Sequence, residues 1–447
     1  MAETRRSRSL RDAVWVGAAA VVTIVASLLA SSGYVWLPLT AFAVFALLIL
    51  LTNHLVRTMI LTAAGCISII AASGVFIPDD SSTLSIVLRV VGAIFMIAGM
   101  LQARSHGFVA SPAQHRLVIQ VLLTLVIPIG LYIALATVPH SMWDPLFSYT
   151  IGLGLMCAVI LASGPQLPSG TLSQAIIVAL TVTVGLSIVC GVVIPELAIE
   201  QARLRGVVNN ANLLGFYAFL LGVVALLVVK KPAWRVALFG MSGLALLWTG
   251  SRASGLALAV TVAVFMFLKG KATGLFVASG LALVAVCIGL VWPSFFDLFS
   301  TITRNNNSRG GSWDVAIEAL RLSPLTGVGL GNESSIIASS PLRAAANAGY
   351  PGLIVIGILW IAILVLTARI GVRTFAFGLA AVVHSCFEGW LLSPVGPMVL
   401  VFALTLCVVA NRELEIKARA AESNEGLTAP PRPNPLISSA QKRPLPA

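Results

Sequence analysis

Apolar runs of about 20 residues recur along almost the whole sequence, and each has the length of a helix that crosses a lipid bilayer. Only 10% of the residues are charged, against roughly 25% in a soluble protein of ordinary composition. The runs do not alternate between apolar and polar residues, as the strands of a membrane barrel would. Helices satisfy their own backbone hydrogen bonds in lipid, so the sequence predicts an all-α polytopic integral membrane protein.

The runs divide the chain into three parts. Fourteen candidate spans lie between residues 13 and 410, and we expect a transmembrane domain of about 12–14 helices there. Residues 1–12 form a basic N-terminus. This start could belong to a signal peptide, but no small-residue cleavage pattern follows it, and we interpret the first run as an anchor. Residues 411–447 are polar and rich in proline, which predicts a disordered cytoplasmic tail.

The placement of lysine and arginine predicts the orientation in the membrane, because short cytoplasmic loops carry an excess of both. With the N-terminus in the cytoplasm, every lysine falls on the cytoplasmic side. Seven arginines then lie outside: Arg203, Arg205, Arg252, Arg304, Arg309, Arg321 and Arg343. The other polar residues of interest also fall at the outer face, so we expect any chemistry on the extracytoplasmic side.

Arginine without lysine at that face has a chemical meaning. A guanidinium grips phosphate oxygens in two places, whereas lysine acts as a point charge. We therefore expect Arg205, Arg252 and Arg309 to bind a diphosphate, with Arg89 nearby in the outer half of a span. The alternative is that these arginines only pair with the acidic residues predicted on the same side.

The loop between residues 293 and 349 is predicted to be one large extracytoplasmic segment. Within it, "GSWDVAIEALRL" predicts an amphipathic helix at the membrane interface, with Ser312 as its N-cap and Pro324 ending it. Its apolar stripe would hold Trp313, Ala316, Ile317 and Leu320. The turn "GVGLGN" would let the backbone approach a ligand closely. The chain has no phosphate-binding P-loop, so we expect no nucleotide ligand. We also expect no nucleic acid partner.

Four motifs occur in a fixed order between residues 200 and 400: "RGVVNNANLLGFYAFLLG", "TGSRASGLAL", "RGGSWDVAIEALRLSPLTGVGLGN" and "NAGYPGLIVIGILW". In this order they resemble the O-antigen ligase and O-antigen polymerase superfamily. The resemblance implies a glycosyltransferase of the integral-membrane type C fold that is inverting, independent of metal and without a cofactor. It also implies the bacterial cytoplasmic (inner) membrane as the location.

The same resemblance implies the substrates and the site. Members transfer a glycan from a polyprenyl diphosphate carrier to a glycan or other hydroxyl acceptor, beside other proteins of polysaccharide assembly. Matched motif by motif, Arg205, Arg252 and Arg309 would contact the diphosphate.

One departure from the family pattern concerns the catalytic base. Ligases of the family carry a His-Asn pair in the outer loop, and the corresponding positions here hold Ala338 and Ser339. No histidine occurs between residues 293 and 349. The candidate bases are then Glu333, His384 and Glu388, and the departure favours a polymerase over a ligase. His384 and Glu388, four residues apart, are predicted to share one helix face.

Two other functions remain open from the sequence. A transporter or a flippase of lipid-linked precursors would suit the many spans, but it should carry ionisable residues near the middle of the membrane and at both faces. A non-catalytic assembly partner would explain the missing loop histidine.

Overall fold

The computed structural model describes residues 54–75, 83–106, 108, 111–163, 169–270, 309–332, 337–393 and 396–428. Three of the candidate spans, two before residue 54 and one at residues 273–292, lie outside these ranges. Glu333 and the chain beyond residue 428 also lie outside them.

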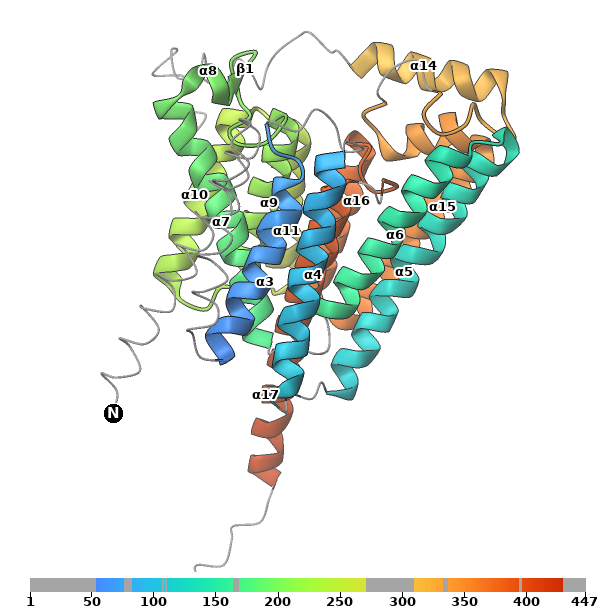
Figure 1. Cartoon of the computed structure of the whole chain (residues 1–447). Coiled ribbons are helices and arrows are strands. Elements are labelled where there is room, and N and C mark those ends of the chain that lie inside the picture. The colour runs from blue at the N-terminus through green and yellow to red at the C-terminus, as the bar shows by residue number, and fades with distance from the viewer. Residues whose placement is uncertain are drawn as a thin grey trace, which may run out of the picture.

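The described chain is a bundle of helices that run between two ends of the molecule (Figure 1). Its long helices are α3 (His54–Ala71), α4 (Thr83–Ser105), α5 (Pro112–Thr137), α6 (Trp143–Ser163), α7 (Ser169–Val193), α9 (Ala211–Leu227), α10 (Pro232–Thr249), α11 (Arg252–Leu268), α15 (Ser340–Ile370), α16 (Val372–Phe387) and α17 (Pro397–Thr428). The short elements are the 3-10 helix η1 (Val138–His140), the helices α8 (Pro195–Ala198) and α14 (Arg309–Leu322), and the antiparallel strands β1 (Ile199–Glu200) and β2 (Arg203–Leu204).

The lengths of these helices confirm the predicted fold class. Among the described residues, five helices are long and apolar enough to cross a membrane, namely α4, α5, α6, α7 and α15. Shorter apolar helices lie within α3, α9, α11 and α16. The chain is thus an all-α, multi-pass membrane protein. The pair α10 and α11, which is separated in the sequence only by a short corner, forms two distinct helices.

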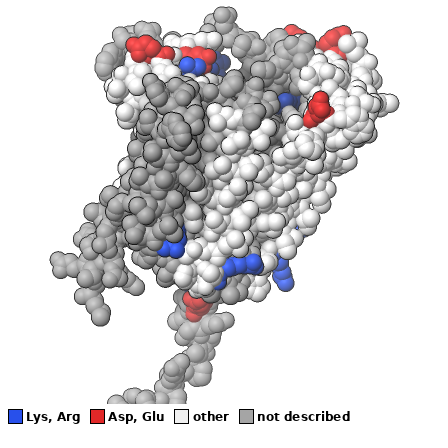
Figure 2. All heavy atoms as spheres, in the orientation of Figure 1, with Lys and Arg blue, Asp and Glu red and all other residues white. Residues whose placement is uncertain are grey.

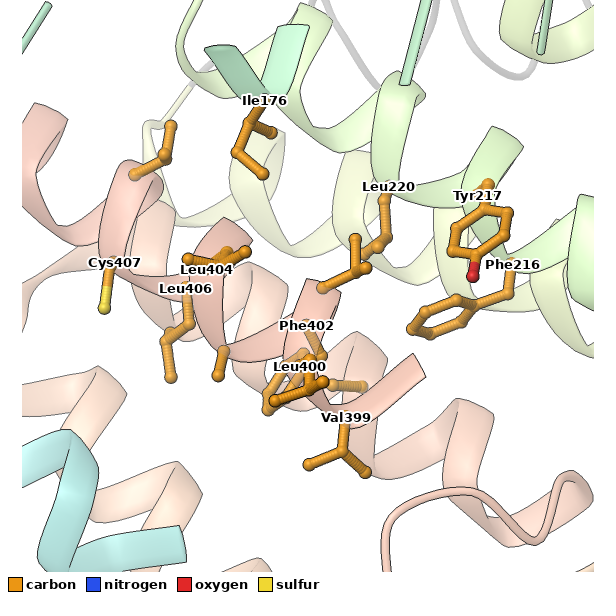
Figure 3. Packing of buried hydrophobic residues seen from close by; sticks show 14 of the residues in the cluster. Ile176, Phe216, Tyr217, Leu220, Val399, Leu400, Phe402, Leu404, Leu406 and Cys407 are labelled. Carbon is orange, nitrogen blue, oxygen red and sulfur yellow. The ribbon is translucent and has the colours of Figure 1, made fainter. Parts of the chain in front are cut away.

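Helices α9 and α17 lie at the centre of the bundle. From Ala211 to Leu227, α9 buries nearly every side chain, and α17 is buried without interruption from Val399 to Ala410. A helix that is apolar on all sides is surrounded either by other helices or by lipid, and other helices surround most of α9 and α17. Helices α9 and α17 are in contact, and Figure 3 shows Val399, Leu400 and Phe402 of α17 near Phe216 and Leu220 of α9.

The two ends of the bundle differ in charge. One end, which we call the hairpin end, carries α8, the β1–β2 hairpin and α14 (Figure 1). At the hairpin end, acidic side chains gather together with a few basic ones, while basic side chains predominate at the opposite end (Figure 2). The lysines Lys230, Lys231 and Lys269 lie where α9 and α11 end, away from the hairpin. This separation matches the arrangement that the lysine and arginine distribution predicted.

The C-terminal region differs from its prediction. Helix α17 continues past residue 411 to Thr428, where the sequence predicted disorder, and its last turns project beyond the bundle (Figure 1). Ion pairs hold the start of the segment to its neighbours: Glu413 lies 2.9 Å from Arg373 of α16, and Glu415 lies 3.6 Å from Lys230, which follows α9. Glu413 and Glu415 therefore attach the start of this segment to the bundle.

Candidate functional site

The first turns of α9 form the centre of the hairpin end. Asn210 caps the helix, since its side chain accepts a hydrogen bond of 2.8 Å from the backbone of Leu213. The backbone N–H of Asn209 donates to the carbonyl of Ser73, at the end of α3, over 2.9 Å. The asparagine pair of the motif "RGVVNNANLLG" therefore fixes where α9 begins and joins it to α3.

Arg205 follows the hairpin directly. Its backbone N–H donates to the carbonyl of Ala198, and its Nε donates to the carbonyl of Leu197 over 3.0 Å. The next residue, Gly206, has a φ of +64° and packs so close to Ser187 that a Cβ would lie 2.1 Å from the serine side chain. In the Arg-Gly pair, hydrogen bonds to α8 fix the arginine, and the glycine makes the tight turn that follows, which only glycine allows.

Arg203 joins the hairpin to two helices, which the sequence did not reveal. Its Nε donates to the carbonyl of Thr249 over 2.6 Å, and its Nη2 donates to the side chain of Asn212. It therefore links β2 with the end of α10 and the first turn of α9. The sequence does not distinguish this structural arginine from Arg205, because only one residue separates Arg203 in β2 from Arg205.

Arg252 begins α11 at the same end of the molecule. The corner before it is made by Gly250, whose φ of +59° ends α10, and by Ser251 at the N-cap of α11. Helix α9 approaches this corner at Gly215, where a Cβ would lie 2.4 Å from the Cβ of Ser251. Glycine at that position brings the exposed Arg252 beside the start of α9.

Arg89 occupies a buried position near the start of α4, with 2% of its surface exposed. Its Nη2 donates to the Ser85 hydroxyl over 2.6 Å, and that hydroxyl in turn donates to the carbonyl of Ala72 over 2.7 Å. Arg89 is thereby held against the end of α3, close to the segment that Asn209 contacts. The structure brings Arg89, Arg205 and Arg252 to the same end of the bundle.

Glu388 lies just beyond α16, so the prediction that it shares a helix face with His384 is wrong. The helix ends at Phe387, and Glu388 adopts an extended backbone with φ −136° and ψ 137°. Its N–H donates to the carbonyl of His384, and its own carbonyl accepts a hydrogen bond of 2.8 Å from Ser340. The backbone of Glu388 is fixed while its side chain stays partly exposed.

His384 is fully buried and engaged through both ring nitrogens. Nδ1 accepts a hydrogen bond of 2.8 Å from the indole of Trp390, and Nε2 lies 3.1 Å from the hydroxyl of Ser254. Phe219 stacks on the ring with a centroid separation of 5.8 Å. This setting argues against His384 as a group that takes a proton from an acceptor sugar.

The first half of the glycine turn packs closely against protein. Gly327 and Gly329 have φ values of +66° and +87°, and a Cβ on Gly327 would lie 2.3 Å from the backbone of Asn347. The N–H groups of Val328 and Gly329 donate to the carbonyls of Ala346 and Asn347. The glycines therefore allow this turn to pack on the backbone of α15.

The same joint sets the kink of α15. Gly349 interrupts that helix with φ +63° and ψ −153°, and a Cβ there would lie 2.3 Å from the carbonyl oxygen of Pro324. The N–H of Tyr350 donates to the same carbonyl over 2.8 Å. The turn after α14 thus fixes the point at which α15 turns into its long apolar part.

Helix α14 differs in detail from its prediction. It begins at Arg309, so Ser312 lies within the first turn and is not the N-cap, while the helix ends before Pro324 as expected. Its buried residues are Ala316 and Ala319, which pack with Ile337 and Ala346. Trp313 and Ile317, predicted to share a stripe with Ala316, are 39% and 41% exposed. Small residues face the protein because α15 approaches closely, and the larger ones face outward.

Two candidate residues have no described side chain. Arg309 is placed as the first residue of α14, and Glu333 falls outside the described ranges. Among the described residues, no group of three or more histidine, cysteine, aspartate or glutamate side chains could hold a metal ion.

Comparison with known proteins adds a family to this geometry. No curated protein matches the chain. Residues 236–356 match the family described as O-Antigen ligase, a segment that includes Arg252, Arg309, the glycine turn and the kink at Gly349. This match confirms the relationship that the motifs indicated: residues 236–356 are similar to the O-antigen ligase family.

Proposed function

We propose that the chain is a membrane glycosyltransferase of polysaccharide assembly. It transfers a glycan from a polyprenyl diphosphate carrier to a hydroxyl acceptor at the extracytoplasmic face of the bacterial inner membrane. The observation that carries the proposal is the gathering of Arg89, Arg205 and Arg252 around the start of α9, through the contacts of Ser85, Asn209 and Gly215 described above. Lys230 and Lys269 follow the opposite ends of α9 and α11.

Arginine side chains suit the leaving group of this reaction. The acceptor oxygen forms a bond to the anomeric carbon while the bond from that carbon to the diphosphate breaks, so the configuration inverts. The diphosphate gains charge as it leaves, and fixed guanidinium groups lower the barrier by stabilising that charge. Arg205, Arg252 and Arg309 supply it in this proposal, without a metal ion.

The acceptor hydroxyl must also lose its proton. Glu388 is the favoured base because its backbone is held by Ser340 while its side chain remains accessible. Glu333 is the second candidate, since it follows the glycine turn in the sequence. We do not propose His384 as the base, because both of its ring nitrogens form hydrogen bonds, to Trp390 and to Ser254.

A polymerase fits the chain better than a ligase. The positions of the family's loop His-Asn pair hold Ala338 and Ser339, and Ser339 is buried at the start of α15 with 1% of its surface exposed. The acceptor would then be the sugar end of a second lipid-linked glycan.

The direct test uses purified protein and a defined polyprenyl-diphosphate oligosaccharide. Longer lipid-linked glycans are the expected product. The same protein in sealed vesicles tests the transport alternative, because a flippase would move the intact donor across the bilayer and leave its glycan length unchanged. Movement without elongation would reject the proposed function.

A further inference from the structure

His384 lies in a closed aromatic pocket between three helices and the loop after α16. None of its surface is exposed, and its ring centroid lies 5.2 Å from Phe216 and 5.8 Å from Phe219, both on α9. Trp390, from the loop, completes the pocket at 6.0 Å. A polar ring in such surroundings needs its hydrogen bonds satisfied, since an unpaired buried polar group is costly.

The two hydrogen bonds identify the tautomer of the ring. The indole Nε1 of Trp390 can only donate, so Nδ1 of His384 carries no proton. The proton of the neutral ring is then on Nε2, which donates to the hydroxyl of Ser254 over 3.1 Å. A second proton on Nδ1 would point at the indole N–H, so this geometry holds the ring neutral.

On one side, the network reaches the start of α11. The Ser254 hydroxyl also accepts a hydrogen bond of 2.9 Å from Ser251, the N-cap residue. These two serines flank Arg252 in the sequence, and all three lie in the cap and first turn of α11. The imidazole is therefore hydrogen-bonded to the turn that carries Arg252.

On the other side, the network reaches the loop that carries Glu388. The carbonyl of His384 accepts from the N–H of Glu388 over 3.1 Å, and its ring holds Trp390 two residues further on. Helix α15 supports the same loop, because Ser340 donates to the carbonyl of Glu388 and Arg343 donates to that of Gly389.

We propose that His384, as a neutral Nε2–H ring, is a positioning residue that ties the first turn of α11 to the loop of residues 388–391. It thereby sets the position of Arg252, the candidate ligand of the diphosphate, relative to Glu388, the candidate base. The kinetic consequence rests on the proposed function, whereas the state of the ring does not.

The ring state is tested by nitrogen NMR of protein labelled at its five histidines. The resonances lost in His384→Asn assign the residue. We expect a protonated Nε2 and an unprotonated Nδ1 from about pH 5 to pH 8, the interval in which an ordinary histidine gains its charge. A ring that protonates within that interval, or one with its proton on Nδ1, would overturn the inference.

Two mild substitutions test the positioning role, because each removes one hydrogen bond from the ring. Ser254→Ala should raise the KM for the lipid donor by about fivefold and also lower kcat, since it loosens the turn of Arg252, which in this proposal holds the diphosphate before and during its departure. Trp390→Phe should lower kcat by about fivefold and leave the KM within about twofold, since it loosens the loop of Glu388. The matched control is Ser242→Ala, which removes a buried hydrogen bond of 2.6 Å to Ala218 outside the network.

The double variant distinguishes a shared device from two separate contacts. If one imidazole transmits both effects, the combined loss of kcat/KM in the Ser254→Ala and Trp390→Phe double variant should be smaller than the product of the single losses. The positioning role would be rejected if the loss of kcat/KM in the double variant equalled the product of the two single losses. It would also be rejected if the single losses were no larger than that of Ser242→Ala.

A measurement without turnover separates this inference from the proposed function. In a chain without its six native cysteines, the rate at which the thiol of the Arg252→Cys variant reacts with a thiol reagent reports the placement of the α11 start. Ser254→Ala should change this rate severalfold and Ser242→Ala should not. If the wild-type chain elongates no glycan while this difference holds, the proposed function fails and the positioning role of His384 stands. An unchanged rate would reject the positioning role.

Discussion

Across the β1–β2 hairpin, the guanidinium of Arg205 lies 3.7 Å from the carboxylate of Glu200, and the two side chains are 24% and 46% exposed. An ion pair as exposed as this one contributes only about 0–1 kcal/mol. A diphosphate offers Arg205 two oxygens for its paired donors and a larger negative charge. We therefore interpret Glu200 as a counter-ion that a bound diphosphate displaces.

The first prediction follows from that competition. Glu200→Gln should lower the KM for the donor by about twofold, because the carboxylate no longer occupies the guanidinium.

The arginines themselves give a related prediction. Arg205→Lys, and equally Arg252→Lys and Arg309→Lys, should lose most turnover at normal expression, since lysine keeps the charge but not the paired N–H donors of the guanidinium.

The control for these variants is Arg321→Lys. Arg321 is 75% exposed on α14 and lies 3.8 Å from Glu318, so its replacement should leave turnover unchanged. Near-normal rates in all three other lysine variants would show that those arginines serve only to balance carboxylates.

The second prediction places the hairpin end outside the cell membrane. In a chain without its six native cysteines, Glu318→Cys on α14 should react with a membrane-impermeant thiol reagent in intact cells. Lys231→Cys, between α9 and α10, should react only after permeabilisation. The opposite pattern would put the arginines in the cytoplasm and remove the proposed site from the face where the glycan is transferred.

The third prediction concerns the joint between the glycine turn and α15. Gly327→Ala combines a φ of +66° with a Cβ 2.3 Å from the backbone of Asn347, so we expect a loss of more than about 2 kcal/mol in stability. Gly357→Ala is the control, because nothing lies within 4 Å of a Cβ at that helical position. Thermal unfolding in detergent would measure both, and an equally stable Gly327→Ala protein would contradict the structure of this joint.

The fourth prediction concerns the opposite end of the bundle. The pair of Arg373 and Glu413 spans 2.9 Å with side chains 15% and 9% exposed. Glu413→Gln leaves a largely buried arginine without its partner charge, and we expect a loss of about 3 kcal/mol. The control is Glu318→Gln, whose exposed pair with Arg321 should contribute less than about 0.5 kcal/mol. Equal unfolding temperatures for the two variants would refute the assignment.

The helices could be predicted from the sequence because lipid permits few alternatives for the backbone. The apolar run of the motif "RGVVNNANLLGFYAFLLG" forms α9, and the motif "TGSRASGLAL" covers the corner between α10 and α11. The lysine distribution likewise predicted which helix ends lie together. These features depend on local composition, which the sequence displays directly.

The contacts within the site depend on which segments meet, and the sequence does not display them. Gly327 looked like a ligand turn because nothing in the sequence places Asn347 against it. The spacing of His384 and Glu388 suggests a pair on one helix face, but α16 ends at Phe387, between them. Nothing in the sequence shows that Trp390 donates a hydrogen bond to His384. The separate roles of Arg203 and Arg205 likewise depend on Thr249, which is distant in the sequence.

The last prediction concerns the base. Removing a proton from the acceptor hydroxyl through a positioned side chain accelerates such a step by roughly 10²–10⁴-fold. Glu388→Ala should therefore bind the lipid donor normally and turn over at least tenfold more slowly. Glu388→Gln, which keeps the shape but cannot take the proton, should be as slow, whereas loss of a structural contact would be rescued by glutamine.

Alanine variants of the remaining candidates complete this test. If Glu333→Ala is slow and Glu388→Ala is not, the base follows the glycine turn. His384→Ala should impair both donor binding and turnover, because Ser254 and Trp390 lose their common partner, whereas a base would affect turnover alone. If all three alanine variants keep full turnover, no side chain among them takes the proton. Catalysis would then depend on the arginines, which stabilise the leaving diphosphate.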